Sequence, residues 1–92
     1  MHATFRWYAD SGVADRLSAH ADEIRSVISG VEGLRGYYLV RTENGTVSVT
    51  VADDQAGVDQ STTMAADWIR ANLPDLASSP PQVSTGEVVI SV

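Results

Sequence analysis

The chain has 92 residues and a formal net charge of −6 at pH 7, from 12 acidic residues and six arginines. This length suits one domain with a single core, and we expect residues 1–92 to form it. The absence of cysteine excludes disulfides, thiolate metal sites and cysteine nucleophiles. An acidic chain without a basic cluster is a poor partner for nucleic acid or anionic membranes, because phosphate neutralisation dominates such binding.

The first ten residues lack the basic start and the apolar stretch of a signal peptide. No apolar run approaches the roughly 18 residues that a membrane span needs. We therefore expect a soluble, cytoplasmic protein whose partners are small molecules or other protein chains.

The first half of the chain predicts a strand, a helix and the start of a hairpin. Residues 3–9 alternate in polarity and are rich in aromatics, as in a strand. From 10 to 31 apolar residues recur at helical spacing, and Asp10 or Ser11 can cap the helix. Gly30 and Gly33 then end it.

Residues 36–54 read as a β-hairpin. Asn44-Gly45 is the pair typical of a two-residue type I′ turn, in which both residues need a positive φ. That turn sets Val40 opposite Val49 and Arg41 opposite Ser48.

The second half adds a helix and a final strand. Asp53 or Asp54 can cap a helix over residues 55–73, which Pro74 ends; residues 74–82 read as a loop and 83–92 as a strand. The order strand, helix, strand, strand, helix, strand predicts a ferredoxin-like α+β fold. In it both helices cover one face of an antiparallel sheet.

The alternation divides the sheet side chains into two faces. We expect the helices to cover the more apolar one, which carries Phe5, Trp7, Tyr38, Val40, Val47, Val49, Val51, Val88 and Ile90. The second face is more polar, with Thr4, Arg6, Tyr8, Tyr37, Leu39, Arg41, Ser48 and Thr50. We expect it to form a two-fold homodimer with Tyr37, Leu39 and Arg41 at the contact; the alternative is a free amphipathic face.

With the element order, the stretches GLRGYYLVR, VSVTVADD and AADWIRANL resemble the dimeric α+β barrel superfamily. The chain is most similar to small bacterial proteins related to antibiotic biosynthesis monooxygenases. The resemblance implies that two ferredoxin-like sheets pack into a barrel and that a pocket lies between each sheet and its helices. The superfamily includes cofactor-free monooxygenases of aromatic polyketides or quinols, haem-degrading enzymes and members without known activity.

Two residue patterns depart from those enzymes. In the polyketide monooxygenases an asparagine precedes a tryptophan by one helical turn, whereas here Trp68 precedes Asn72. The haem-degrading enzymes use a histidine from a C-terminal helical region, and this chain has none after His20, which argues against haem.

The candidate catalytic residues are His20 and Asn72. His20 lies between Leu17 and Ile24 on the inward side of its helix, where it is either a proton acceptor or a boundary histidine with one hydrogen bond. Asn72 can polarise a substrate oxygen or cap the helix end.

Aromatic side chains provide candidate walls for a planar ligand. Trp7, Tyr38 and Trp68 are either such walls or ordinary core residues. Arg6 and Arg41 can hold an anionic group inside a dimer, or pair with carboxylates such as Glu87; we adopt the pairing.

Two functions follow from these candidates. One is a homodimeric, cofactor-independent monooxygenase that acts on a small aromatic substrate of quinol or polyketide type. The other is a non-catalytic dimeric module that binds a small ligand or serves in assembly. We expect no metal and no cofactor in either.

Overall fold

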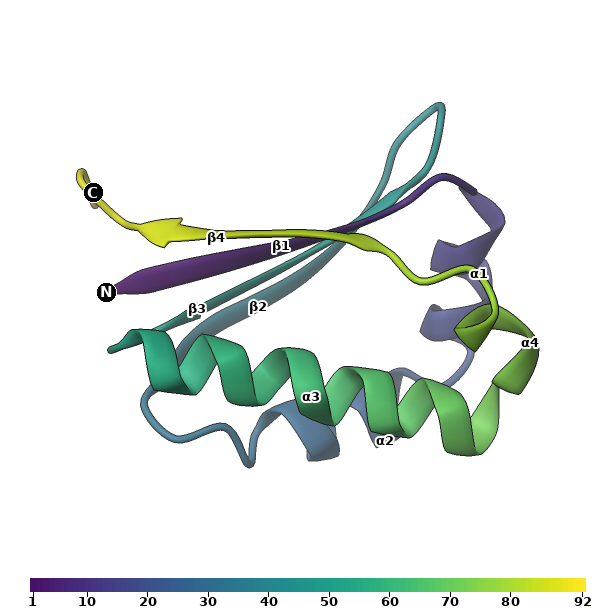
Figure 1. The fold of residues 1–92 in the computed structure, drawn as a ribbon, viewed down its shortest axis with the longest axis horizontal. Helices are drawn as coiled ribbons and strands as arrows, with labels where there is room; N and C mark the ends of the chain where they lie inside the picture. The colour runs from purple at the N-terminus through teal and green to yellow at the C-terminus, as the bar shows by residue number, and fades with distance from the viewer.

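The computed structural model describes residues 1–92, which fold into four strands and four helices (Figure 1). The strands pair antiparallel in the order β2-β3-β1-β4, and the helices lie on one side of the sheet (Figure 1). This confirms the ferredoxin-like α+β fold. The elements are β1 (His2–Tyr8), α1 (Gly12–Ser18), α2 (Ala21–Ile28), β2 (Leu34–Arg41), β3 (Thr46–Ala52), α3 (Gln55–Asn72), α4 (Pro74–Ala77) and β4 (Gln82–Glu87).

The helix predicted over residues 10–31 is divided into α1 and α2. Between them the N–H of His20 donates to the carbonyl of Leu17 at 3.0 Å, which is a tighter turn than an α-helix makes. Asp22 and Glu23 lie in the first turn of α2, where carboxylates favour a helix start. Both helices turn their apolar side chains toward the sheet, so the periodicity continues across the break and does not reveal it.

The remaining elements are close to their predicted bounds. The Asp54 side chain accepts a hydrogen bond from the N–H of Gly57 at 3.1 Å and caps α3, which ends at Asn72. Part of the predicted loop is α4, with Pro74 in its first turn. The last strand is shorter than predicted, because β4 ends at Glu87. None of the helices combines the length and the apolar character needed to cross a membrane.

The register of the β2–β3 hairpin is not the predicted one. Val40 lies opposite Val47 instead of Val49, and Arg41 lies opposite Thr46 instead of Ser48. The shift is two residues, and side chains alternate with a period of two, so each stays on the face to which it was assigned.

The turn itself explains the shift. The N–H of Thr42 donates to the carbonyl of Gly45 at 2.8 Å, which leaves Glu43 and Asn44 as the two central residues. Gly33 is the only residue with a positive φ, so no type I′ turn forms.

Gly45 is required for close packing against β1. A Cβ atom at this position would lie 2.2 Å from the carbonyl oxygen of Tyr8 and 2.6 Å from the ring of Trp7. Glycine is therefore needed here for space, and the turn forms one residue earlier.

The helices cover the opposite sheet face from the one predicted. The covered face carries Thr4, Arg6, Tyr8, Tyr37, Leu39, Thr46, Ser48 and Thr50. The uncovered face, called the open sheet face below, carries Phe5, Trp7, Tyr38, Val40, Val47, Val49 and Val51. On it Phe5 remains 44% exposed and Tyr38 62% exposed. Of the two C-terminal residues assigned to the helix side, Ile90 is exposed and both lie beyond β4.

The covered face tolerates polar residues because its threonine hydroxyl groups find partners. The Oγ1 of Thr46 donates to the carbonyl of Asp10 and accepts from the N–H of Ala14, both at 3.0 Å. A satisfied hydroxyl costs little to bury, and threonine and serine are small enough to let the helices approach. The helices provide most of the apolar core, through Val13, Ala14, Leu17, Ile28, Val58 and Ile69.

Candidate ligand-binding cavity

A small cavity, called the central cavity below, lies between the covered face and the helices. About 20 Å³ of it is open to the centre of a water molecule, which is room for about one water. The strands contribute Arg6, Tyr8, Tyr37 and Ser48, and the helices contribute Leu17, Ile24, Val27, Ile28, Ala65, Trp68 and Ile69.

Two wider clefts adjoin the central cavity. The α2 cleft, between α2 and β2, measures about 380 Å³ and shares Tyr37 and three aliphatic residues with the cavity. The α4 cleft, between α3, β1 and the segment after α4, measures about 310 Å³ and shares Arg6, Tyr8 and Ile69. The central cavity thus shares part of its lining with a larger cleft on each side.

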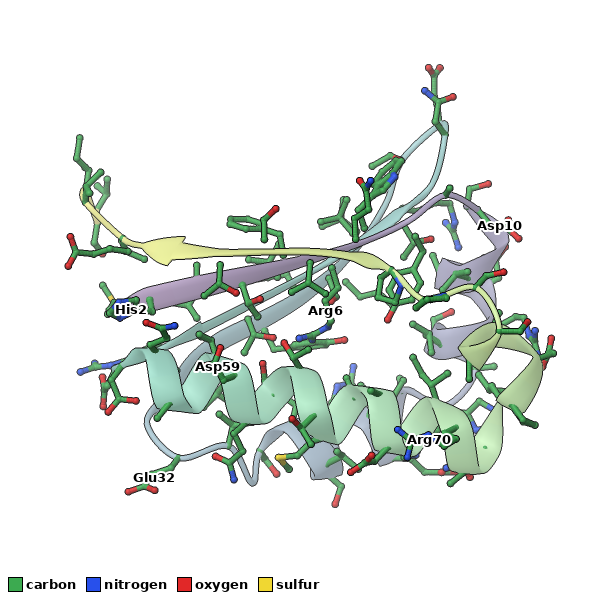
Figure 2. The ribbon with its side chains drawn as sticks, viewed as in Figure 1. His2, Arg6, Asp10, Glu32, Asp59 and Arg70 are labelled. Carbon is green, nitrogen blue, oxygen red and sulfur yellow. The ribbon has the colours of Figure 1, made fainter.

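Arg6 is the most unusual residue of the cavity, because it is a charged side chain that is only 2% exposed. It extends from β1 toward α3 (Figure 2). Its Nη1 donates to the hydroxyls of Ser61 at 3.3 Å and Thr62 at 3.2 Å, and its Nη2 donates to Thr50 at 3.2 Å. A guanidinium stays protonated in proteins. A full positive charge is therefore buried among neutral hydroxyl groups.

The other five arginines all pair with an aspartate on the surface, as arginine usually does. The pairs are Arg16–Asp75, Arg25–Asp22, Arg35–Asp53, Arg41–Asp15 and Arg70–Asp67. Pairing with a carboxylate was the interpretation adopted for Arg6 and Arg41; it is correct for Arg41 and wrong for Arg6.

Two buried polar atoms of the cavity lining have no hydrogen-bond partner. They are Nε of Arg6 and Oγ of Ser48. The two residues lie directly opposite each other on β1 and β3, and both face the helices. Native proteins rarely leave such atoms unpaired, so each requires an explanation.

Two phenols accompany the guanidinium. Burial raises the pKa of both Tyr8 and Tyr37 above 10.0, and the positive charge of Arg6 opposes part of each increase. The phenols therefore remain neutral donors near pH 7.

The titratable residues do not form a metal site. No group of three or more histidine, aspartate or glutamate side chains is placed to hold an ion. The lining instead combines one cation, two phenols and apolar walls, which suits an organic anion.

Of the predicted site residues, Trp68 lines the central cavity and His20 does not. The two rings contact each other edge to face, with centroids 5.3 Å apart. The His20 side chain is 37% exposed, and its Nδ1 lies 3.5 Å from Oε1 of Glu23. Asn72 is exposed, and its Nδ2 donates to the backbone carbonyl of Trp68 at 3.0 Å. His20 and Asn72 both lie beside Trp68 but outside the cavity.

The aromatic residues of the sheet have exchanged their predicted places. Trp7 and Tyr38 lie on the open sheet face and cannot be cavity walls in one chain. Tyr37 and Leu39, predicted at a dimer contact, lie under the helices, and Tyr37 lines the cavity. Arg41 is on the same side and pairs with Asp15 of α1.

Tyr8 and Ser48 were not among the predicted site residues, and Arg6 was expected either to hold an anionic group inside a dimer or to pair with a carboxylate. The stretch TFRWY, residues 4–8, contained a signal, because it places a single arginine between two aromatic residues of a strand. The sequence did not show which face of the sheet the helices cover, so it did not show that this arginine lies under them.

No protein-family model matches the sequence, and a search of curated proteins found no match. Solved structures do match. One is a "putative antibiotic biosynthesis monooxygenase" from Bordetella bronchiseptica, with a TM-score of 0.72, 17% identity and coverage of 97% of each chain.

Two further structures have the same fold at lower scores. A dimeric ferredoxin-like protein from an uncultured marine organism has a TM-score of 0.59 at 16% identity, over 99% of this chain and 94% of that one. A single-residue variant of SnoaB, a cofactor-independent oxygenase from Streptomyces nogalater, has a TM-score of 0.59 at 13% identity, over 99% and 96%. At these identities the likeness shows that the chain has the fold of antibiotic biosynthesis monooxygenase-like proteins.

Proposed function

We propose that the protein is a homodimer that catalyses cofactor-independent mono-oxygenation of a small aromatic substrate of quinol or polyketide type. The observation that carries the proposal is the buried Arg6, which faces two phenols and apolar walls in a space between sheet and helices. The likeness to SnoaB, which is a cofactor-independent oxygenase, supports the reaction type.

The chain's own residues would stabilise a substrate anion. A substrate with an acidic ring methylene loses a proton to solvent as it enters, and the fixed charge of Arg6 favours the resulting anion over the neutral form. The apolar walls exclude water from this anion while it passes electrons to O₂. Overall CH₂ + O₂ gives C=O + H₂O: both C–H bonds break, one oxygen atom stays on the carbon, and the other leaves as water with the two hydrogens.

The open sheet face supports the homodimer. It presents seven apolar and aromatic residues in one continuous patch, without a charged side chain among them. A second copy related by a two-fold axis would cover the same patch on both chains. The proposed contact therefore replaces the one predicted through Tyr37, Leu39 and Arg41.

Oxygen uptake with dithranol, an anthrone, tests the activity. The expected result is uptake above the enzyme-free rate without added metal or flavin. Arg6→Met should lower this rate by about 10² to 10³-fold, as loss of a fixed electrostatic stabiliser does. Arg35→Met removes a paired surface arginine and should leave the rate unchanged. An Arg6→Met rate equal to that of the parent would remove the proposed mechanism.

The same assay tests the proposed roles of His20 as a base and Asn72 as a donor. Because neither lines the cavity, we expect His20→Ala and Asn72→Ala to change the rate by less than about threefold, while a general base contributes 10² to 10⁴-fold. A loss of that size in His20→Ala would establish it as the base, acting when the cavity opens past Trp68.

The non-catalytic dimeric module is the second candidate. It is favoured by the narrowness of the central cavity and by the position of His20 outside it. The dithranol assay separates the two candidates, because a dimeric parent protein with no uptake above the blank is expected only for the module.

A further inference from the structure

We propose that the α2 cleft binds an apolar carboxylate, whose carboxylate group enters the central cavity and is held there by Arg6 and Ser48. The proposal names the charge and class of the ligand, and it rests on the proposed function in taking this cavity as the ligand site. It is carried by three observations: an uncompensated buried charge, two unpaired donors beside each other, and an adjoining apolar cleft.

The first observation is the missing counter-ion. All 12 acidic residues of the chain are exposed, and none pairs with Arg6. Burying an isolated guanidinium costs several kcal/mol, and three neutral hydroxyls compensate for only part of this. Five arginines of the same chain have a carboxylate partner at the surface. The sixth is buried without one, so its partner has to come from another molecule.

The second observation is the set of unused donors. A guanidinium has five N–H groups, and three of those of Arg6 are used, which leaves two, the Nε–H among them. The unpaired hydroxyl of Ser48 lies on the neighbouring strand, directly opposite Arg6. A carboxylate has two oxygens that accept such donors, and arginine binds it in a two-point geometry.

The third observation concerns the rest of the ligand. The α2 cleft is lined mainly by aliphatic side chains, and Tyr37 borders both this cleft and the central cavity. An apolar or aromatic body fits the cleft while its carboxylate reaches inward. A phosphate group is a poorer fit, because its second negative charge would have a single cation to face.

Isothermal titration calorimetry with two matched compounds tests the proposal. 1-Naphthoate and 1-naphthamide have nearly the same shape, but only the first is charged at pH 7.5. We expect the parent protein to bind 1-naphthoate at least tenfold more tightly than 1-naphthamide. Arg6→Met should reduce this ratio to below twofold, and Ser48→Ala should weaken 1-naphthoate binding several-fold while it leaves 1-naphthamide binding unchanged. Arg35→Met is the matched control and should retain the tenfold ratio.

Three results would overturn the proposal: similar binding of both compounds to the parent, binding of neither, or an unchanged ratio in Arg6→Met. If circular dichroism shows that Arg6→Met is unfolded, the proposal is still tested by the ratio of the two affinities in the parent and by the binding of 1-naphthoate to Ser48→Ala. Oxygen uptake is independent of this measurement. A protein that prefers 1-naphthoate but consumes no oxygen supports the ligand class and contradicts the enzymatic function. A protein that consumes oxygen but binds both compounds equally supports the enzymatic function and contradicts the ligand class.

Discussion

Replacing Tyr38 by alanine should weaken the proposed homodimer by about two orders of magnitude. Tyr38 is 62% exposed, more than any other aromatic residue of the open sheet face, so its loss affects the monomer least. A tyrosine side chain has roughly 200 Å² of surface, of which about 125 Å² remains available for a partner. At about 25 cal/mol per Å² this area corresponds to about 3 kcal/mol per protomer and about 6 kcal/mol per two-fold dimer.

Alanine keeps part of this area and the tyrosine hydroxyl is polar, so about half, roughly 3 kcal/mol, should be lost. Since 1.4 kcal/mol is tenfold in Kd, the dimer should dissociate at about 100-fold higher concentration. Sedimentation equilibrium over a dilution series measures this change. Arg25→Ala, which removes an exposed side chain of α2, should leave Kd unchanged. A Tyr38→Ala value within threefold of the parent would refute the reasoning, and so would a parent that is monomeric at micromolar concentration.

Three further predictions concern stability. Gly45→Ala should lower the free energy of unfolding, measured by urea denaturation, by about 1–3 kcal/mol, because the added Cβ meets the backbone of Tyr8. The control Gly86→Ala, whose Cβ has nothing within 4 Å, should be neutral or stabilising. Equal effects of the two variants would contradict the packing role of Gly45. Arg6→Met should change the free energy of unfolding by less than about 2 kcal/mol, because removal of the buried charge offsets the loss of its hydrogen bonds. A loss of about 3–5 kcal/mol would instead indicate that Arg6 belongs to a buried ion pair. Burial raises the pKa of Tyr8 and Tyr37 in the folded protein, so the stability that they contribute is complete below about pH 10 and is lost as the pH rises through their folded pKa values. In Tyr38→Phe, which keeps only these two phenols, absorbance at 295 nm should titrate above pH 10.0 when folded and near it in urea.

Local patterns were sufficient to predict the fold. Alternation of polarity predicts each strand, and helical periodicity with a capping residue predicts the long helix α3. Each of these signals lies within a short stretch of sequence. The grouping of side chains into two faces was also correct, because a two-residue register error does not change the face.

The side of the sheet that the helices cover could not be predicted in the same way. The more apolar face was assigned to the helices because a single chain gains most by burying it. In a homodimer the two faces of the sheet contact different partners, the helices on one side and the second chain on the other. The more apolar face can then contact the second chain. The choice then depends on whether hydroxyls such as that of Thr46 find partners under the helices, which sequence periodicity does not record.

The candidate site changed with the side of the sheet. Arg6 and Tyr37 were assigned to the face away from the helices, and Trp7 and Tyr38 were assigned to the pocket. The expected position of Trp68 on α3 did not depend on which sheet face the helices cover, and Trp68 does line the cavity.

The pairing of five arginines with aspartates has a consequence for how fast an anionic ligand can arrive. The two charges of each pair neutralise each other. Seven side-chain carboxylates without an arginine partner remain on the outside, while the one arginine without a carboxylate partner is enclosed. At long range an approaching carboxylate therefore meets a repulsive field, and it meets the attractive charge only after it has entered. Salt screens the outer field over about 10 Å at 0.1 M but reaches the enclosed charge much less. Adding salt should thus speed the association of 1-naphthoate and leave its dissociation nearly constant.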